Sequence, residues 1–475
     1  MSTSATPKHI LDRIGLVCFV PEVTKGTPNW NLDADDTTSG GPIQSTTVTY
    51  VDTATGSGAH DLALNGAADD LFIGMLLYAV DGANAGAVVE ITDFAEASSA
   101  AVFTHTAWAS GSPVADTNQI YLIGPLQASD ASFTPHTENV PREGFARQTL
   151  DGPSSLKGKT FGTGSFNFEP IAMEVPSTSS AAATMDGMSQ FLRAIGTRRV
   201  GVGTTFAAGW NTVTGDVADA SGLLAGDYIM GGTNNEIRRI TSISTNTLVT
   251  APPWSTTPIN TETCLPAEQW VPADTGHQSH TILYVADDTY VEFKGCVFSF
   301  GLTGEIGGKV MASAEFDCGS WSQNSSAFTV LGQQSARRAL EFKASGVHHF
   351  STTALGITSF EWTLGHGRTE LFDTAAGNLY FASTRESTMS VTHRDQGESA
   401  LALRETWESS GTIAKLIIAV GNATGAAVGV GGQAQVQDPS EYSSVNEFRH
   451  FDTTFAFVDN QESAATAEKP IFFRF

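Results

Sequence analysis

Charged residues are scarce in this sequence and make up only 16% of its 475 residues. Those present are mostly acidic, because 50 Asp and Glu residues outnumber 25 Lys and Arg residues and leave a formal net charge of −25. A surface of this sign repels DNA, RNA and anionic lipids at ordinary salt concentrations. The composition therefore argues against a protein that reads nucleic-acid sequence or binds a membrane surface. It would suit a protein past which DNA moves without being held.

Cysteine is also scarce, with four residues at Cys18, Cys264, Cys296 and Cys318 and no CxxC pair. A structural zinc site or a disulfide framework needs more cysteines, or cysteines at closer spacing. We therefore expect four reduced, buried thiols. The sequence predicts no metal site and no other cofactor.

Long apolar runs are missing as well. The most apolar run, residues 413–420, is short and contains Lys415, so no segment is predicted to span a membrane. The first fifteen residues, MSTSATPKHILDRIG, contain no apolar core of a secretory signal. These features predict a soluble, intracellular protein.

Motifs of known enzymes are absent from the sequence, which has no GxSxG elbow, no HExxH pair and no kinase-type glycine loop. Gly158-Lys159-Thr160 resembles the end of a phosphate-binding loop, but five residues instead of four separate Gly152 from Gly158. An alternating polar and apolar pattern follows it, which indicates a strand and not the helix that a phosphate site requires. Asp33 begins a segment like a calcium loop, but that segment lacks the required Gly and bidentate Glu. We expect the chain not to be an enzyme.

What the sequence does contain is a high proportion of Gly, Ser and Thr, with frequent turn signals and few helical stretches. Its hydrophobic content of 41% is sufficient for packed cores. This combination predicts a mainly β fold with several domains.

Two glycine-rich segments, residues 70–108 and 222–254, follow a similar pattern. Each has Leu-x-x-Gly, an apolar pair, a Gly/Asn turn, an Ile-Thr strand, a Val-Thr strand and a Trp. The matched residues are Gly74 with Gly226, Ile91 with Ile240, and Trp108 with Trp254. We expect two small antiparallel β modules, the second a repeat of the first, inserted at residues 42–125 and 199–266.

The remaining residues repeat a plan of strand, strand, helix, strand and strand. The first copy, a discontinuous β-sandwich, comprises residues 1–41, 126–198 and 267–330, and the second copy comprises residues 331–475. The predicted elements of the first copy are strands at 131–133 and 160–169, a helix within 179–196 and a hairpin at 291–317. Those of the second copy are strands at 357–364 and 387–395, a helix at 398–411, strands at 412–421 and 426–436, and closing strands at 451–460 and 470–475.

Alternation along these strands gives each one a polar face and an apolar face. The residues predicted on the polar faces are Thr163, Ser165, Asn167, Glu169, Ser299, Thr303, Lys309, Ser313, Glu315, Thr388, Ser390, Thr392 and Arg394. The apolar faces include Phe166, Phe298 and Phe316. The predicted helix likewise places Met185, Met188, Phe191, Leu192 and Ile195 on one face.

Three segments of the sequence together resemble the tail tube proteins of long-tailed, non-contractile bacteriophages. They are QFLRAIG at 190–196, DDTYVEFKGCVFSFGLTGEIGGKVMASAEFD at 287–317, and the terminal FAFVDN and PIFFRF. The resemblance implies β-sandwiches, each with a flanking helix, whose hairpins pair between subunits into a closed barrel. The rings stack into a tube, and the inserts correspond to outward decorations.

From this resemblance we expect a structural virion protein of the phage tail, assembled in the host cytoplasm, whose polar lumen conducts DNA. The thirteen polar-face residues would then line the lumen or its barrel strands. A duplicated chain implies a trimeric ring with pseudo-sixfold symmetry, and a hexamer is the alternative. The implied partners are further copies of the chain and the tape measure, tail tip and tail terminator proteins. The alternative function is a carbohydrate-binding or adhesive β-module protein of a fibre or surface layer.

Overall fold

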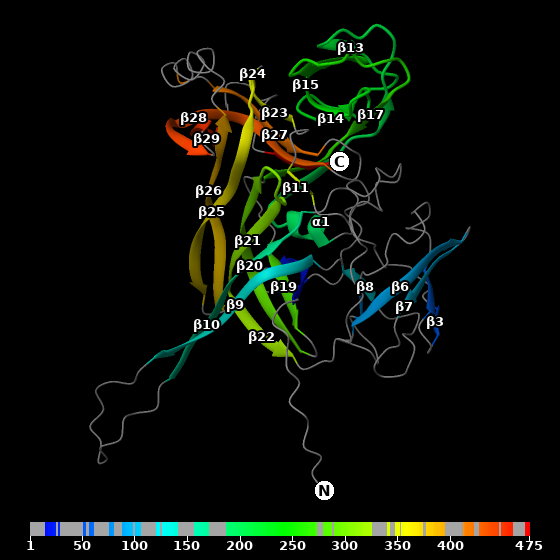
Figure 1. Cartoon of the computed structure of the whole chain (residues 1–475). Coiled ribbons are helices and arrows are strands. Elements are labelled where there is room, and N and C mark those ends of the chain that lie inside the picture. The colour runs from blue at the N-terminus through cyan, green and yellow to red at the C-terminus, as the bar shows by residue number, and fades with distance from the viewer. Residues whose placement is uncertain are drawn as a thin grey trace, which may run out of the picture.

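The computed structural model describes residues 15–24, 27–28, 51–53, 57–60, 76–79, 88–97, 100–105, 120–123, 126–140, 156–170, 187–272, 279–286, 289–324, 340–342, 347–351, 353–373, 377–394, 411, 413–421, 427–445, 448–458 and 471–475. These residues form thirty strands and one short helix. All pairings between strands are antiparallel within this part of the chain, so the predicted mainly β class is confirmed (Figure 1).

Six strands close into a barrel in the first half of the fold. Its members are β1 (Gly15–Thr24), β9 (Leu126–Val140), β10 (Leu156–Phe168), β21 (Met311–Cys318), β20 (Thr289–Glu305) and β19 (His280–Ala286), and β19 pairs back to β1. Two shorter strands extend this barrel, β2 (Thr27–Pro28) along β1 and β22 (Ser320–Asn324) along β20. The interior is aromatic, and Phe166, Phe298 and Phe316 are each 1% exposed.

Helix α1 (Gly187–Leu192) packs against this aromatic core. The ring of Phe191 lies between 5.2 and 5.5 Å from the rings of Phe19, Phe168, Phe298 and Phe300. Met188, Phe191, Leu192 and Ile195 are buried, so these four members of the predicted apolar face are confirmed. Met185 lies outside the described residues, and so do residues 398–410 of the second predicted helix, 398–411.

The second half contains two layers of strands. One layer continues from β20 through β25 (Ile357–Asp373), β26 (Gly377–Arg394), β29 (Phe448–Phe457) and β28 (Val428–Val445). The other runs through β24 (Thr353–Ala354), β23 (Val347–Phe350), β27 (Ile413–Val420), the first part of β28, β30 (Ile471–Arg474), β18 (Glu268–Pro272) and β11 (Gly196–Val200). Because β28 takes part in both layers, it joins them along one edge.

The two halves share one hydrophobic core. Strand β20 pairs with β25 from Phe300 opposite Leu364 to Glu305 opposite Ser359. The buried cluster runs without a break from Phe19 in the first half to Phe455 in the second. The pairing of β20 with β25 therefore makes a single continuous sheet of eight strands, β9-β10-β21-β20-β25-β26-β29-β28.

Two separate six-stranded sheets project from this body. The first has the order β3-β4-β7-β6-β5-β8 and comprises β3 (Val51–Thr53), β4 (Ser57–His60), β5 (Leu76–Ala79), β6 (Val88–Ala97), β7 (Ala100–His105) and β8 (Ile120–Ile123). The second has the order β12-β17-β14-β15-β16-β13 and comprises β12 (Thr204–Thr205), β13 (Thr214–Asp216), β14 (Tyr228–Gly231), β15 (Glu236–Ser244), β16 (Thr247–Ala251) and β17 (Thr263–Pro266).

The sheet of residues 204–266 has a core of its own and also packs on the second half of the fold. Trp210, Trp254 and Phe206 meet edge to face inside it, with ring centroids 5.1 to 6.1 Å apart. On its other side, Tyr228 stacks on Phe473 with the ring centroids 4.2 Å apart. The sheet is therefore anchored to the body and not only tethered to it.

A buried ion pair joins β18 to the C-terminal strand β30. Arg474 Nε donates to Glu268 Oε2, and both side chains are 0% exposed. The backbones of the same two residues are opposite one another in the sheet. An uncompensated buried charge is costly, so each member of the pair depends on the other.

We predict that Arg474→Met destabilises the chain by about 3–5 kcal/mol, because it leaves the Glu268 carboxylate buried without this cation. The matched control is Lys309→Met, which removes an ion pair with Glu169 whose side chains are 61% and 40% exposed. Chemical denaturation followed by intrinsic fluorescence measures both variants. Equal stability of the two variants would contradict the prediction.

Candidate functional site on the polar sheet face

The eight-stranded sheet has one apolar face and one polar face. Along β20, buried Phe298, Phe300 and Leu302 alternate with Ser299, which is half-buried, and Thr303, which is exposed. The same alternation continues across β10, β21, β25, β26 and β29. The apolar face closes the core described above, so the polar face is the one that remains for contact with solvent or a partner.

All thirteen polar residues singled out from the sequence fall within described segments. Eleven lie in strands of this sheet, whereas Glu169 follows the end of β10 and Lys309 lies in the turn between β20 and β21. The strand registers align them in rows: Ser165-Glu315-Ser299, Asn167-Ser313-Gly301-Thr363-Thr388, Thr303-Glu361-Ser390-Thr454 and Glu305-Ser359-Thr392-Asp452. Residues predicted separately on four strands are thereby brought onto one surface.

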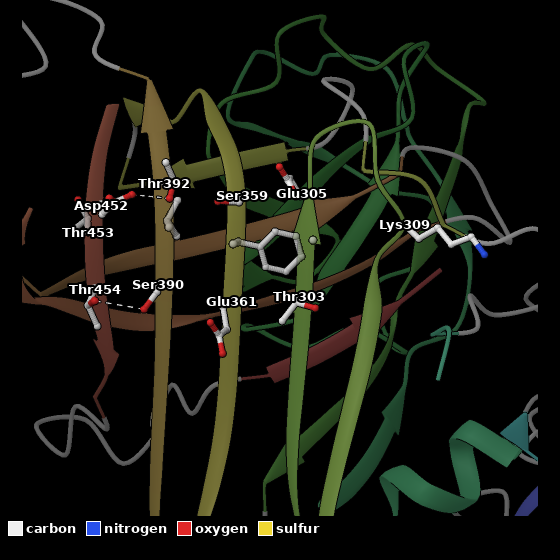
Figure 2. A pocket seen from close by; sticks show the side chains of 13 residues that line it. Thr303, Glu305, Lys309, Ser359, Glu361, Ser390, Thr392, Asp452, Thr453 and Thr454 are labelled. Carbon is white, nitrogen blue, oxygen red and sulfur yellow. Dashed lines mark hydrogen bonds between the residues drawn. The ribbon is translucent and has the colours of Figure 1, made fainter. Parts of the chain in front are cut away.

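A hollow of about 560 Å³ lies on this face over β20, β25, β26 and β29 (Figure 2). Its polar lining includes Thr303, Glu305, Glu361, Ser390, Thr392 and Asp452. Thr392 Oγ1 donates to Asp452 Oδ1 over 2.6 Å, and the hydroxyls of Ser390 and Thr454 lie 3.3 Å apart. Most of the lining side chains are short, so they leave the hollow open on one side. The hollow is therefore an open depression in the sheet surface and not an enclosed binding pocket.

The face carries more acid than base. Glu305, Glu315, Glu361 and Asp452 are all exposed. The basic side chains nearby are engaged: Lys309 Nζ lies 2.5 Å from Glu169, and Arg368 Nη1 donates to Asp317 over 2.8 Å. A polyanion brought to this face would meet carboxylates with few unpaired cations to bind it.

Several residues of this face were not predicted from the sequence, among them Glu305, Ser359, Glu361, Arg368 and Asp452. Glu361 lies in the predicted strand ITSFEWTL. The alternation used for the other strands would have placed it on the polar face, because Phe360 and Trp362 on either side of it belong to the apolar face. Alternation in FDTTFAF would likewise have placed Asp452 on the face opposite to Phe451 and Phe455, but only the pairing of β29 with β26 brings it beside Thr392.

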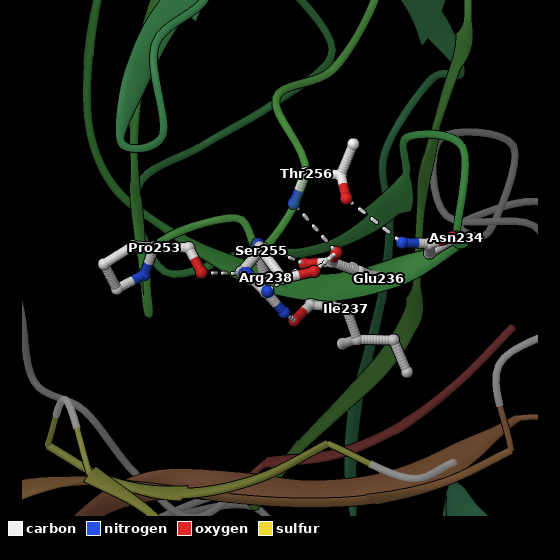
Figure 3. Close-up of polar contacts among 7 residues, drawn as sticks. All are labelled: Asn234, Glu236, Ile237, Arg238, Pro253, Ser255 and Thr256. Carbon is white, nitrogen blue, oxygen red and sulfur yellow. Dashed lines mark hydrogen bonds and ion pairs between the residues drawn. The ribbon is translucent and has the colours of Figure 1, made fainter.

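A second polar cluster lies inside the sheet of residues 204–266 (Figure 3). Arg238 pairs with Glu236 and donates through Nε to the carbonyl of Pro253 over 3.0 Å. Glu236 in turn accepts hydrogen bonds from the backbone amides of Ser255 and Thr256. The guanidinium of Arg238 also lies 5.2 Å from the centre of the Trp254 ring. All these contacts are internal, so we assign the cluster a structural role in holding the segment after β16.

Other residues considered from the sequence have structural environments. The Gly158-Lys159-Thr160 segment lies within strand β10, so the strand interpretation is confirmed and the phosphate loop is excluded. Trp254 is 2% exposed and is not available as a platform for a sugar; its counterpart Trp108, like Asp33, lies outside the described residues. His348 is buried and His349 is half-buried, because adjacent residues of a strand point to opposite faces. Burial lowers the pKa of His348 to about 3.

All four cysteines are free and buried, as predicted. Burial raises the pKa of Cys18 and that of Cys264 to about 12, so neither thiol is a nucleophile at neutral pH. Within the described segments, no group of three or more His, Cys, Asp or Glu residues is arranged to hold a metal ion. No helix in that same part of the chain is long and apolar enough to cross a bilayer.

No protein-family model matches the chain, and no curated protein matches it either.

The cluster around Glu236 predicts a pH dependence of stability. Burial alone would raise the pKa of Glu236, but hydrogen bonds from Ser255 and Thr256 and the charge of Arg238 outweigh it and lower the pKa below its ordinary value of 4.5. A lowered carboxyl pKa stabilises the fold above the unfolded-state value, and this contribution is lost as pH falls through the folded-state value. The stability difference between the wild type and Glu236→Gln should therefore be constant near neutral pH and shrink below pH 4.5. Thermal denaturation of both proteins over this range measures it, and a difference that grows on acidification would contradict the prediction.

Proposed function

We propose that the chain is a structural protein of a phage tail tube, which assembles into stacked rings whose polar β-barrel lumen conducts DNA. The observation that carries the proposal is the eight-stranded sheet, which has one mostly polar, acidic face. Among the described residues, each of its terminal strands also has one open side, β9 beyond Ala128 and β28 beyond Gln435. Such a sheet is a hazard for a protein that stays monomeric, because open edges recruit other strands. Assembly into a closed barrel removes both edges at once.

A barrel closed from the eight strands of a single chain could not accommodate the polar face in its interior. An eight-stranded barrel has an interior only just wide enough to be filled by side chains, whereas this face carries exposed carboxylates such as Glu305, Glu361 and Asp452. Three chains contribute three times eight strands. At about 4.8 Å between strands and a tilt of about 40°, twenty-four strands give a backbone diameter of about 50 Å. That width leaves a hydrated channel through which duplex DNA can pass.

The pairings of the strands support a tandem duplication of one tube domain. In the first set β1 pairs with β19, β9 with β10, β10 with β21, β19 with β20, β20 with β21, and β20 with β22. In the second set β23 pairs with β27, β25 with β26, β26 with β29, β27 with β28, β28 with β29, and β28 with β30. Six pairings therefore recur in the same order along the chain. Two such domains in each of three chains give a pseudo-sixfold ring.

The two small sheets support the predicted inserted repeat. Five strands have the same spatial order in both, β4-β7-β6-β5-β8 and β13-β16-β15-β14-β17. Both also have an irregular register directly after the matched isoleucines, between Ile91 and Asp93 and between Ile240 and Ser242. We propose that these sheets are decorations on the outside of the tube.

We expect the purified chain to form rings of three copies, each with a mass of three times 50.0 kDa, about 150 kDa, and stacks of such rings. Native mass spectrometry gives the number of chains, and electron microscopy shows whether the particles are hollow. A stable monomer with no ring or tube at high protein concentration would overturn the proposal.

The acidic face predicts that assembled wild-type tubes do not retain duplex DNA. The triple variant Glu305→Lys, Glu361→Lys and Asp452→Lys should retain it at about 50 mM salt and lose it as salt rises, because lysines that neutralise phosphates release counterions. The matched control is Glu305→Gln, Glu361→Gln and Asp452→Asn, which removes the negative charge without adding a positive one and should still fail to hold DNA. A pull-down with labelled duplex measures all three. Strong DNA retention by the wild type, or none by the lysine variant, would contradict the prediction.

A further inference from the structure

The eight-stranded sheet ends in two strands that each have an open side. Strand β9 pairs with β10 along its length but meets β1 only at residues 126–128, so within the described part of the chain no strand covers its other edge beyond Ala128. Strand β28 pairs with β29 from residue 434 onward, and no described strand covers the opposite edge beyond Gln435. Figure 1 shows these two strands at opposite ends of the body.

The recurring pairings allow the two domains to be aligned residue by residue, starting from the last pairs of the equivalent hairpins, Ala286–Thr289 and Val420–Val428. Along one route, β1 and β23 align Phe19 with Phe350 through their pairings with β19 and β27. Continuing along the hairpins β19-β20 and β27-β28 aligns Phe298 with Val436. The partners of these two residues on the next strand are Phe316 and Phe455, both buried phenylalanines. The agreement of this last pair supports the alignment.

The alignment assigns an equivalent to each open edge. From Phe316 and Phe455 it continues to Ser313 and Asp452, and through their partners it matches Glu441–Val445 of β28 with Gly301–Glu305 of β20. Through β10 and β26 it matches Ser132–Thr134 of β9 with Glu361–Thr363 of β25, and it matches Ser129 with Ser359 across a bulge in β9. Inside the chain, the β20 segment and the β25 segment are paired with each other.

We infer that the β28 edge of one chain pairs antiparallel with the β9 edge of a second copy, in the register that joins β20 to β25 within the chain. This inference rests on the proposed function and specifies its interface. The register follows from the internal pairs Gly301–Thr363, Leu302–Trp362 and Thr303–Glu361. The corresponding pairs between chains are Glu441–Thr134, Tyr442–Phe133 and Ser443–Ser132.

The partial exposure of side chains on β9 indicates that this strand lacks a neighbouring strand on one side. Phe133 occupies the position equivalent to Trp362, yet Phe133 is half-buried whereas Trp362 is 1% exposed beneath its neighbouring strand. Ser132 and Thr134 are exposed. A bulge opposite Ser165–Asn167 and Pro135, which has no N–H to donate, bound the stretch that can pair to residues 132–134. A strand laid along β9 would complete the cover of Phe133 and satisfy the open backbone groups.

Cysteine cross-linking tests this register. Paired residues in an antiparallel sheet have Cα atoms about 4.5–5.5 Å apart, which a disulfide can bridge, whereas diagonal neighbours are about 7–8 Å apart. The matched variants are Ser132→Cys with Ser443→Cys, and Thr134→Cys with Glu441→Cys. The crossed controls are Ser132→Cys with Glu441→Cys, and Thr134→Cys with Ser443→Cys. The four native cysteines are buried and contribute little background.

On oxidation, both matched variants should give covalent dimers and trimers on a non-reducing gel, and the ladder should stop at three chains. The crossed variants should give several-fold less product. The register would be overturned if rings formed normally but the matched variants failed to cross-link, or if the crossed variants cross-linked better. Either result would leave the proposed function standing. Absence of rings from the wild type would overturn both. If a cysteine variant fails to fold, hydrogen exchange of the wild type tests the same interface. The backbone amides at 132–134 and 441–443 should become protected on assembly. Unchanged exchange there would refute the pairing of β28 with β9 between chains.

Discussion

The pairing of β20 with β25 is the contact on which the rest of the structure depends. It joins two groups of strands into one sheet, places their polar residues on one face and gives them one core. Strand β20 can serve both halves because it bends at Gly295, whose φ of 70° is readily adopted by glycine. Residues 289–294 pair with β19 and β22, Cys296 still pairs with His280 of β19, and residues 297–305 pair with β21 and β25.

An extended sheet with one polar face poses a physical problem that the chain does not solve alone. Its apolar face is covered by its own layers, but both terminal strands keep an open edge among the described residues. Repetition of the β20–β25 contact between copies would solve this problem with geometry that the chain already uses. The acidic polar face would then line the enclosed space, where repulsion of phosphates favours passage over binding. Assembly and transport would thus depend on the same strands.

Alternation along individual strands could be read from the sequence because it depends only on neighbours in the chain. It identified the polar face of β10, β20, β21 and β26, and the apolar face of α1. The proposed equivalence of β29 with β21 could not be read in this way, because it depends on partners far apart in sequence. The predicted plan of the second copy placed the strand at 426–436 in the position of the second strand of the 291–317 hairpin. The proposed duplication instead matches β28 with the first strand of that hairpin, β20, and β29 with the second, β21. The packing of Tyr228 on Phe473 was likewise beyond local pattern, since it joins an inserted sheet to the C-terminal strand.

The most direct measurement of the central claim is a cryo-electron microscopy reconstruction of the assembled protein at a resolution that separates strands. The account predicts threefold rings in which twenty-four strands form a continuous barrel, with β28 of each chain beside β9 of the next. It also predicts that Glu305, Glu361 and Asp452 face the lumen. A reconstruction with these carboxylates on the outside, or with β9 and β28 exposed in the assembled particle, would contradict it.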